Sequence, residues 1–110
     1  MPGKAFIILL GALATDGDTI TAGGQAVRLW GIDAPEMDRR AGRRAAGHMS
    51  RLIEGAELTC RIKDVDQYDR IVAQCFNPQG QDLACLMVEA GHADDWPRFS
   101  GGYYRVCKPD

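Results

Sequence analysis

The chain has 110 residues, enough for one hydrophobic core and too few for two, so we expect a single domain over residues 1–110. Hydrophobic residues make up 45% and charged residues 25% of the chain, which excludes a disordered or collagen-like protein. The formal net charge of −2 excludes a uniformly basic nucleic-acid coat protein. The longest apolar run, residues 5–10, is too short to cross a bilayer, so we expect no membrane association.

The cationic residues are unevenly distributed along the chain. Ten of the thirteen are arginines, and five of these lie close together: Arg39, Arg40, Arg43, Arg44 and Arg51. The planar guanidinium group matches phosphate oxygens better than the lysine ammonium group does. The cluster therefore leaves a phosphate-bearing partner open despite the acidic total charge.

Four cysteines are many for a chain of this length, and they stand at positions 60, 75, 85 and 107. No pair has the C-x-x-C spacing, which argues against a zinc ribbon or a thioredoxin-type site. A disulfide formed in an oxidising compartment is the better use for at least two of them. We therefore favour an extracytoplasmic location, periplasmic or secreted.

Residues 5–15 are apolar and partly β-branched, which predicts a buried first strand. Residues 1–14 also resemble a short secretory signal, with one lysine, an apolar stretch and a small-residue cleavage site. We favour the strand, because cleavage after Ala14 would leave nothing to support the turn that begins at Asp16.

A turn at residues 16–18 precedes a predicted hairpin, formed by residues 19–22 and 26–32 around a Gly-Gly pair. Pro35 ends the second strand of this hairpin, because it lacks an N–H group and keeps the preceding residue extended. The hairpin therefore leads into a second turn, which carries its own acidic residues.

Residues 41–54 form the first predicted helix, with apolar residues at helical spacing and a glycine cap. Arg39 and Arg40 each stand four positions before another arginine, and these like charges repel each other. The helix dipole also disfavours cations at this end of a helix. The arginines therefore serve something other than helix stability, unless they lie in a solvated, flexible loop.

Residues 57–63 and 71–76 are predicted strands joined by a charged connection, and residues 82–90 are a second predicted helix. Beyond Gly91 the sequence is loop-like. This order predicts an α+β fold that is mainly β: a five-stranded barrel of the OB type with two packed α-helices. Periodicity alone does not separate that barrel from another α+β fold.

Acidic residues mark the two turns that flank the hairpin. Asp16 and Asp18 lie in the first turn, and Asp33 and Glu36 lie in the second. If the barrel brings the turns together, the carboxylates repel each other unless a cation sits among them. Oxygen ligands without His or Cys favour Ca²⁺ or Mg²⁺. Each turn taken alone is an ordinary polar turn. The evidence for a functional site is the combination of the two turns with Arg28.

Three motifs follow one another in the chain: Asp16-Gly17-Asp18-Thr19, then Arg28-Leu29-Trp30-Gly31-Ile32-Asp33-Ala34-Pro35-Glu36, then Asp66-Gln67-Tyr68-Asp69-Arg70. Their order and spacing resemble the staphylococcal-nuclease-like (thermonuclease) family over residues 10–105. The resemblance implies an OB-fold enzyme that hydrolyses DNA and RNA with a metal ion and leaves 3′-phosphate products. It also implies nucleic acid substrates, with single or frayed strands preferred.

The resemblance implies a role for each matching residue. Asp18 and Asp33 resemble the carboxylate ligands of one Ca²⁺ ion, with the Ala34 carbonyl as a third ligand and Asp16 as a nearby or water-mediated partner. Glu36 resembles the residue that positions the attacking water. Arg28 and Arg70 resemble the two arginines that bind the scissile phosphate.

The chain departs from the family pattern in three places. Gln67 stands where the family has a lysine, which removes one cation from the substrate groove. A tyrosine that follows the second helix in the family has no clear counterpart, because Trp96 and Pro97 occupy that region. We leave open whether Tyr103 or Tyr104 lies near the site. The long C-terminal helix is missing or vestigial, so we favour a monomer but leave open a dimer that completes the core by exchange.

The aromatic and histidine residues can also be explained by packing or solvent exposure, without a part in catalysis. Tyr68 either contacts the substrate, as an aromatic does there in the family, or packs on its own connection. Trp30 is expected in the core, and Trp96 and Phe99 are expected to cover the open barrel end. His48 and His92 need no catalytic role.

Cys60 and Cys75 fall on the two strands of one predicted hairpin. They are cross-strand neighbours that form a disulfide, if their side chains share a face, or two buried free thiols. Pairing of Cys85 with Cys107 is conceivable but poorly constrained by the sequence.

Two other readings compete with the enzyme. One is a catalytically inactive nuclease-like module that binds nucleic acid or protein through the barrel. The other is an inactive fragment that lacks the C-terminal helix needed for stable folding. Because the carboxylates and both phosphate-binding arginines are present, a calcium-dependent nuclease leads.

Overall fold

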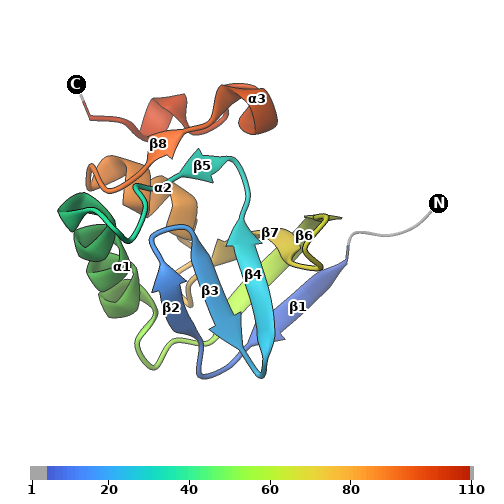
Figure 1. Ribbon diagram of the computed structural model, residues 1–110. Helices are drawn as coiled ribbons and strands as arrows, with labels where there is room; N and C mark the ends of the chain where they lie inside the picture. The colour runs from blue at the N-terminus through green and yellow to red at the C-terminus, as the bar shows by residue number, and fades with distance from the viewer. Residues whose placement is uncertain (1–4, 110) are drawn as a thin grey trace.

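A computed structural model describes residues 5–109, and a curled six-stranded sheet dominates it (Figure 1). The strand order in the sheet is β1-β6-β7-β4-β3-β2. The strands are β1 (Phe6–Leu9), β2 (Leu13–Asp16), β3 (Thr19–Ala22), β4 (Gln25–Leu29), β6 (Leu58–Val65) and β7 (Ile71–Phe76). The first four residues of the suggested signal segment lie outside the described residues.

The two edge strands of this curled sheet are neighbours in the chain. β1 pairs with β6 and β2 pairs with β3, yet only residues 10–12 separate β1 from β2. The expected single strand over residues 5–15 is therefore wrong. The chain turns at Gly11, whose φ of 64° suits glycine best, and counting this bent strand once gives the five-stranded barrel that the sequence predicts.

The second hairpin strand is shorter than expected. β4 ends at Leu29, and Gly31 turns the chain with a φ of 82°. A Cβ atom at Gly31 would lie 2.9 Å from the Tyr104 ring, so glycine is also needed for close packing. The next two residues form β5 (Ile32–Asp33), which pairs with β8 (Asp94–Asp95) in a separate two-stranded sheet.

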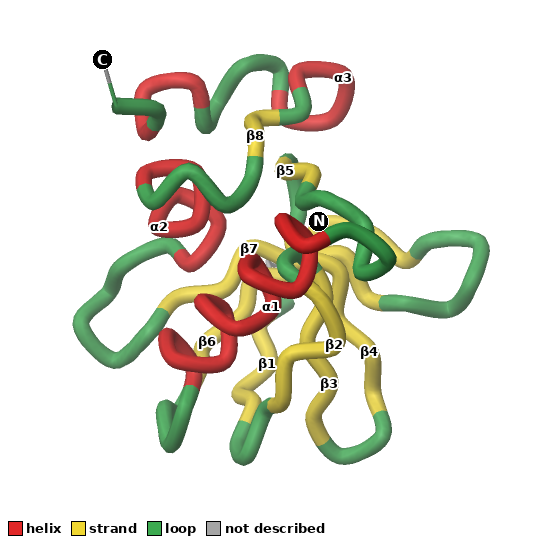
Figure 2. Tube along the Cα trace, turned by 60° about the vertical axis from the view of Figure 1, so that its left-hand side comes forward, coloured by secondary structure: helices red, strands yellow, loops and turns green. Residues whose placement is uncertain are grey.

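Two main helices cover the barrel, as Figure 2 shows from a second side. They are α1 (Arg40–Ile53) and α2 (Leu83–Glu89), close to the expected bounds. The buried face of α1 includes Ala45, Met49 and Ile53, which join the core. The C-terminal region contains only α3 (Pro97–Ser100) and the 3₁₀ helix η1 (Arg105–Cys107), so the third helix is short as predicted.

Two disulfides link these elements. Cys60 and Cys75 lie directly opposite each other on β6 and β7, with their Cα atoms 4.0 Å apart. Cys85 of α2 is bonded to Cys107 of η1. Within residues 5–109 no helix is both long and apolar enough to cross a membrane.

Buried polar contacts complete the C-terminal packing. Asp82 caps α2 through one carboxylate oxygen, and its other oxygen accepts hydrogen bonds from Gln74 and from the Tyr104 hydroxyl, each at 2.8 Å. Burial and the neighbouring Asp82 raise the pKa of Tyr104, so this hydroxyl stays protonated. Tyr104 therefore anchors the C-terminal segment to the barrel without a long helix.

Candidate active site

The barrel brings the two acidic turns together at Asp18. This side chain is buried, and its Oδ2 accepts a hydrogen bond from the Ala34 backbone N–H at 2.8 Å. Between the two aspartates, a Cβ atom on Gly17 would lie 2.7 Å from the Cβ atoms of both Ala34 and Ala45. The close approach of the first turn to the second turn and to α1 therefore depends on this glycine.

The charge on Asp18 is unfavourable without a cation. Burial raises the pKa of Asp18 to about 6, and the neighbouring Asp16 adds to the increase. The Arg28 guanidinium and the Ala34 N–H group act in the opposite direction but do not offset burial. Asp16 Oδ1 also accepts the Asp18 N–H at 3.0 Å, which fixes the turn.

The other two carboxylates lie at the surface. In β5 Ile32 points inward, so the next residue, Asp33, is exposed, and its register partner is Asp94. Glu36 is also exposed. Within residues 5–109 no three His, Cys, Asp or Glu side chains form a group suited to a metal ion, so the four expected carboxylates do not make one cluster.

The backbone of Glu36 packs against the first turn of α1. Its carbonyl oxygen accepts the Arg39 N–H at 3.1 Å. A Cβ atom on Gly42 would lie only 1.8 Å from that same oxygen, so no larger residue fits at position 42 without a shift. This contact fixes the backbone of Glu36 while its carboxylate remains open to solvent.

Arg28 is positioned by several contacts of β4 and β5. Its guanidinium group donates hydrogen bonds to the backbone carbonyls of Leu29 at 2.8 Å and Ile32 at 3.0 Å. It also lies 3.4 Å from Asp18 Oδ2 and 5.7 Å from the centre of the Trp96 ring. These contacts fix the orientation of the guanidinium group.

Arg70 is positioned by its own loop. Its Nε donates to Asp66 Oδ2 at 2.7 Å, while Asp66 Oδ1 accepts the backbone N–H groups of Tyr68 and Arg70. Desolvation acts to raise the pKa of Asp66, but these donors and the Arg70 charge outweigh it, so the pKa lies below its usual value. The sequence pattern did not identify Asp66 as a partner, although it opens the third motif.

Arg28 and Arg70 open onto one cavity of about 520 Å³. Gln67 and Tyr68 of the β6–β7 loop also line it, and the Tyr68 side chain is 70% exposed. An aromatic wall of Trp30, Trp96 and Phe99 lines another part of the cavity, and the carboxylates Asp64 and Asp66 also line it. Trp30 is therefore not a simple core residue, and Trp96 and Phe99 face the same space as the two arginines.

Neither C-terminal tyrosine lines this cavity. Tyr104 is fully buried and bonds to Asp82, and the Tyr103 hydroxyl lies 3.5 Å from Gln74 Nε2. The aromatic side chains that face the arginines from the region after α2 are Trp96 and Phe99 instead. Their sequence signal was only their position after the second helix.

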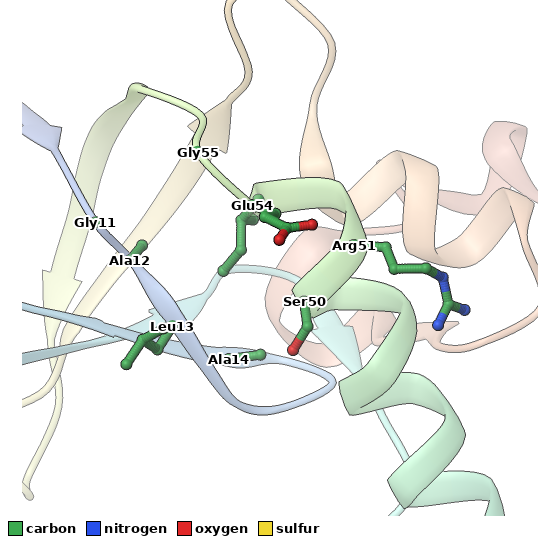
Figure 3. Close-up of a pocket in the computed structure, with 9 residues that line it drawn as sticks. Gly11, Ala12, Leu13, Ala14, Ser50, Arg51, Glu54 and Gly55 are labelled. Atoms are coloured by element: carbon green, nitrogen blue, oxygen red, sulfur yellow. The ribbon is translucent and has the colours of Figure 1, made fainter.

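A second cavity of about 350 Å³ lies between residues 11–14 and the C-terminal end of α1 (Figure 3). Small and apolar side chains line one side of it, and Figure 3 shows the Arg51 guanidinium directed away from residues 11–14. Because no pair of cationic groups converges there, this cavity lacks the chemistry of the first.

The donors around Asp18 fit a hard divalent cation. A buried, charged carboxylate with a second carboxylate beside it gains most from such an ion, as the raised pKa of Asp18 indicates. Since no group of three acidic side chains is present within residues 5–109, a cation here would need backbone oxygen and water as further ligands. Ca²⁺ and Mg²⁺ both accept such ligands.

Comparisons with known proteins identify a family and several relatives. Residues 26–101 match the family model described as staphylococcal nuclease homologue. The succinoglycan biosynthesis protein ExoI of Rhizobium meliloti (strain 1021) is 32% identical over 93% of this chain and 59% of its own length.

Two further relatives are named uncharacterized endonucleases. The Escherichia coli protein is 37% identical, and the protein of Escherichia coli O157:H7 is 35% identical. Each alignment covers 71% of this chain and 54% of the relative. The chain therefore spans little more than half the length of the curated relatives it matches.

Proposed function

The chain belongs to the staphylococcal nuclease family, and on that basis we propose that it is a calcium-dependent nuclease. It hydrolyses phosphodiester bonds of DNA and RNA, prefers single strands, and leaves 3′-phosphate products. The observation that supports this most is the opening of Arg28 and Arg70 onto one cavity. Two relatives named as endonucleases support the same reaction class.

The two arginines bind the scissile phosphate. Attack on a phosphodiester builds negative charge on the phosphoryl oxygens, and guanidinium groups placed there lower the barrier. Asp18 and two backbone carbonyls orient Arg28, and Asp66 orients Arg70. Both groups therefore meet the phosphate with little reorganisation.

Glu36 is the residue we assign to the attacking water. Its carboxylate is exposed, while its backbone is fixed against Gly42. A carboxylate within hydrogen-bond reach of a water can orient it and accept its proton. The exposed position leaves Glu36 free to do this once substrate fills the site.

One Ca²⁺ ion completes the site in this proposal. Asp18, Asp33 and the Ala34 carbonyl would hold it, with Asp16 as a nearby or water-mediated partner. When bound, the ion supplies positive charge beside the phosphoryl oxygens. It would also stabilise the charged form of Asp18, which burial disfavours, as the raised pKa indicates.

The aromatic wall and the β6–β7 loop contact the rest of the substrate. Tyr68 is exposed beside Arg70, whose guanidinium carbon lies 5.7 Å from the ring centre. Aromatic faces stack on any base, which suits single strands and little sequence preference. Gln67 offers a neutral hydrogen-bonding group at the same edge.

The two disulfides support an oxidising, extracytoplasmic compartment. We propose that the protein works there as a monomer, because Tyr104 and Cys107 attach the C-terminal segment to the barrel. Light scattering of the oxidised protein should give the mass of one chain, and twice that mass would support exchange between two copies.

Digestion of heat-denatured DNA tests the proposed reaction. The purified chain should cleave with Ca²⁺ and stop with chelator, and both Glu36→Gln and Arg28→Ala should lose most activity. Glu89→Gln is the control for Glu36→Gln, since Glu89 is an exposed carboxylate at the end of α2. Arg28→Lys is the control that keeps the positive charge but removes the guanidinium group. Thermal melts show which variants fold.

The competing function is a module that binds without cleaving. A chain that melts cooperatively but leaves DNA intact in Ca²⁺ would contradict the nuclease proposal and favour that module. Cleavage that persists in a folded Arg28→Ala variant would contradict the assigned role of Arg28.

A further inference from the structure

A groove beside α1 lies apart from the active-site cavity. Its lining is Arg40, Arg43, Arg44, Gly47, Arg51 and His92, and its volume is about 430 Å³. We call this surface the arginine groove. Because residues three, four or seven positions apart share a helix face, the arginines extend along about 16 Å of α1. That length can hold several successive phosphates of one strand.

Within residues 5–109, no ion pair involves an arginine of this groove. The ion pairs within residues 5–109 join Arg28 to Asp18 and Arg70 to Asp66. α1 also has no acidic residue in its first turn and no side-chain cap at its N-terminus. Arg40, Arg43 and Arg44 repel one another and oppose the helix dipole near the N-terminus of α1, whereas Arg51 stands in the last turn, where the dipole favours a cation. The charges near the N-terminus are therefore better explained by an anion that binds there.

His92 lines the groove, and a second histidine, His48, lies beside it. The rings of His48 and His92 lie 4.7 Å apart. Burial lowers the pKa of His48, and the neighbouring His92 and Arg51 lower it further. In Figure 3 the Arg51 guanidinium extends away from residues 11–14, which lie on the other side of the helix.

Gly47 gives the groove an open floor. Glycine is unfavourable in the middle of a helix, and nothing at this position requires it. A Cβ atom there would meet only Arg51 Nη1, at an ordinary contact distance of 3.7 Å. The missing side chain therefore leaves space between the arginines rather than relieving a clash.

We propose that the arginine groove is a second binding site, for the sugar–phosphate backbone of the nucleic acid strand that the active site cleaves. This inference rests on the proposed nuclease function. α1 begins just after the loop that carries Glu36, and Arg43 donates to the Met37 carbonyl of that loop at 3.2 Å. A strand that leaves the active site can therefore continue into the groove. Phosphate contacts give affinity without reading bases.

Binding of a labelled 30-nucleotide single strand in chelator tests the groove without cleavage. Arg44→Gln combined with Arg51→Gln should weaken affinity at least tenfold in 0.1 M salt. The slope of log affinity against log salt should fall by about 1.4, because each phosphate contact contributes about 0.7 in single strands. The control, Arg105→Gln with Lys108→Gln, removes the same charge outside the groove and should change affinity less than twofold.

Two variants of Gly47 test whether the space at this position contributes to strand affinity, because neither variant changes the charge of the groove. Gly47→Gln fills the groove and should weaken binding several-fold while raising the melting temperature. Gly47→Ala should raise the melting temperature with little change in affinity. Equal binding by both variants and the parent would contradict the open-floor argument and the proposed site.

Further outcomes distinguish this inference from the nuclease function. If the parent never cleaves DNA but the arginine variants still lose affinity for it, the nuclease proposal fails and the groove proposal stands. If the parent cleaves and the Arg44/Arg51 variant binds the strand as tightly as the parent does, only the groove proposal is overturned. Loss of affinity for an acidic polysaccharide such as alginate, with DNA affinity intact, would also overturn it.

Discussion

The active-site cavity and the arginine groove use the same side chain in opposite surroundings. In the cavity, Arg28 and Arg70 each lie beside a carboxylate, at 3.4 Å and 2.7 Å. In the part of the chain that the structure describes, no ion pair involves an arginine of the groove. Partnered guanidinium groups place one phosphate for reaction, whereas unpartnered ones attract a whole strand. The comparison predicts that turnover and strand affinity can be changed separately.

The largest expected effect is on turnover. Arg28→Ala removes a preorganised donor to the phosphate, so single-turnover cleavage in Ca²⁺ should fall about a thousandfold, or about 4 kcal/mol. Strand affinity in chelator should fall far less than turnover, because only one phosphate contact is lost and the groove is intact. A similar loss of affinity and of turnover would contradict the division between the two regions.

Removal of the Cys60–Cys75 disulfide should reduce turnover at the cavity more than strand affinity at the groove. The bond joins β6 and β7, whose connecting loop carries Arg70. Replacing both cysteines with alanine should cost about 3 kcal/mol of unfolding free energy, measured in urea, and should also reduce turnover.

The disulfide between Cys85 and Cys107 offers the matched control. It joins α2 to η1, away from the residues that line the cavity. Its removal should cost a similar free energy in urea while turnover of the folded protein stays close to the parent value. The reverse pattern would show that the β6–β7 bond does not support the position of Arg70.

Asp18→Asn should stabilise the metal-free protein at high pH. The pKa of Asp18 is raised to about 6 in the folded state, so its contribution to stability is complete below pH 4 and is lost as the pH rises through 6. Neutral asparagine avoids this loss, which is about 3 kcal/mol at pH 8.

Thermal melts in chelator between pH 5 and pH 8 measure this difference. The advantage of Asp18→Asn should grow with pH, and added Ca²⁺ should stabilise the parent alone. An advantage that is the same at every pH would argue against a charged, buried Asp18.

The smallest expected effect concerns the position of Arg70. Asp66→Asn keeps the shape of the side chain but removes its charge, so turnover should fall about tenfold as Arg70 moves. Asp64→Asn is the control, because Asp64 lines the same cavity without contacting Arg70. Equal losses in the two variants would indicate a general charge effect instead of positioning.

Local sequence patterns predicted much of this fold. The helix bounds at 41–54 and 82–90 are nearly right, because apolar spacing and caps determine them. The bend at Gly11 was missed, since an unbroken apolar run does not reveal that its two halves pair with different strands. The pairing of β5 with β8 was missed for the same reason, because such contacts between distant segments leave no local pattern.

The placement of the site residues was predictable where it depends on the residue's own motif. The structure places Arg28 and Arg70 on one cavity and joins the two acidic turns through Asp18. The partners that orient these groups depend on packing and could not be read from spacing. Asp66 is a near neighbour in the chain, but Trp96 reaches Arg28 only because β8 returns to β5.

A crystal structure with Ca²⁺ and a nucleoside 3′,5′-bisphosphate would test the central claim most directly. The account predicts one ion at Asp18 and Asp33, and one phosphate within hydrogen-bond distance of both Arg28 and Arg70. A phosphate bound elsewhere, or an ion that leaves Asp18 without contact, would contradict it.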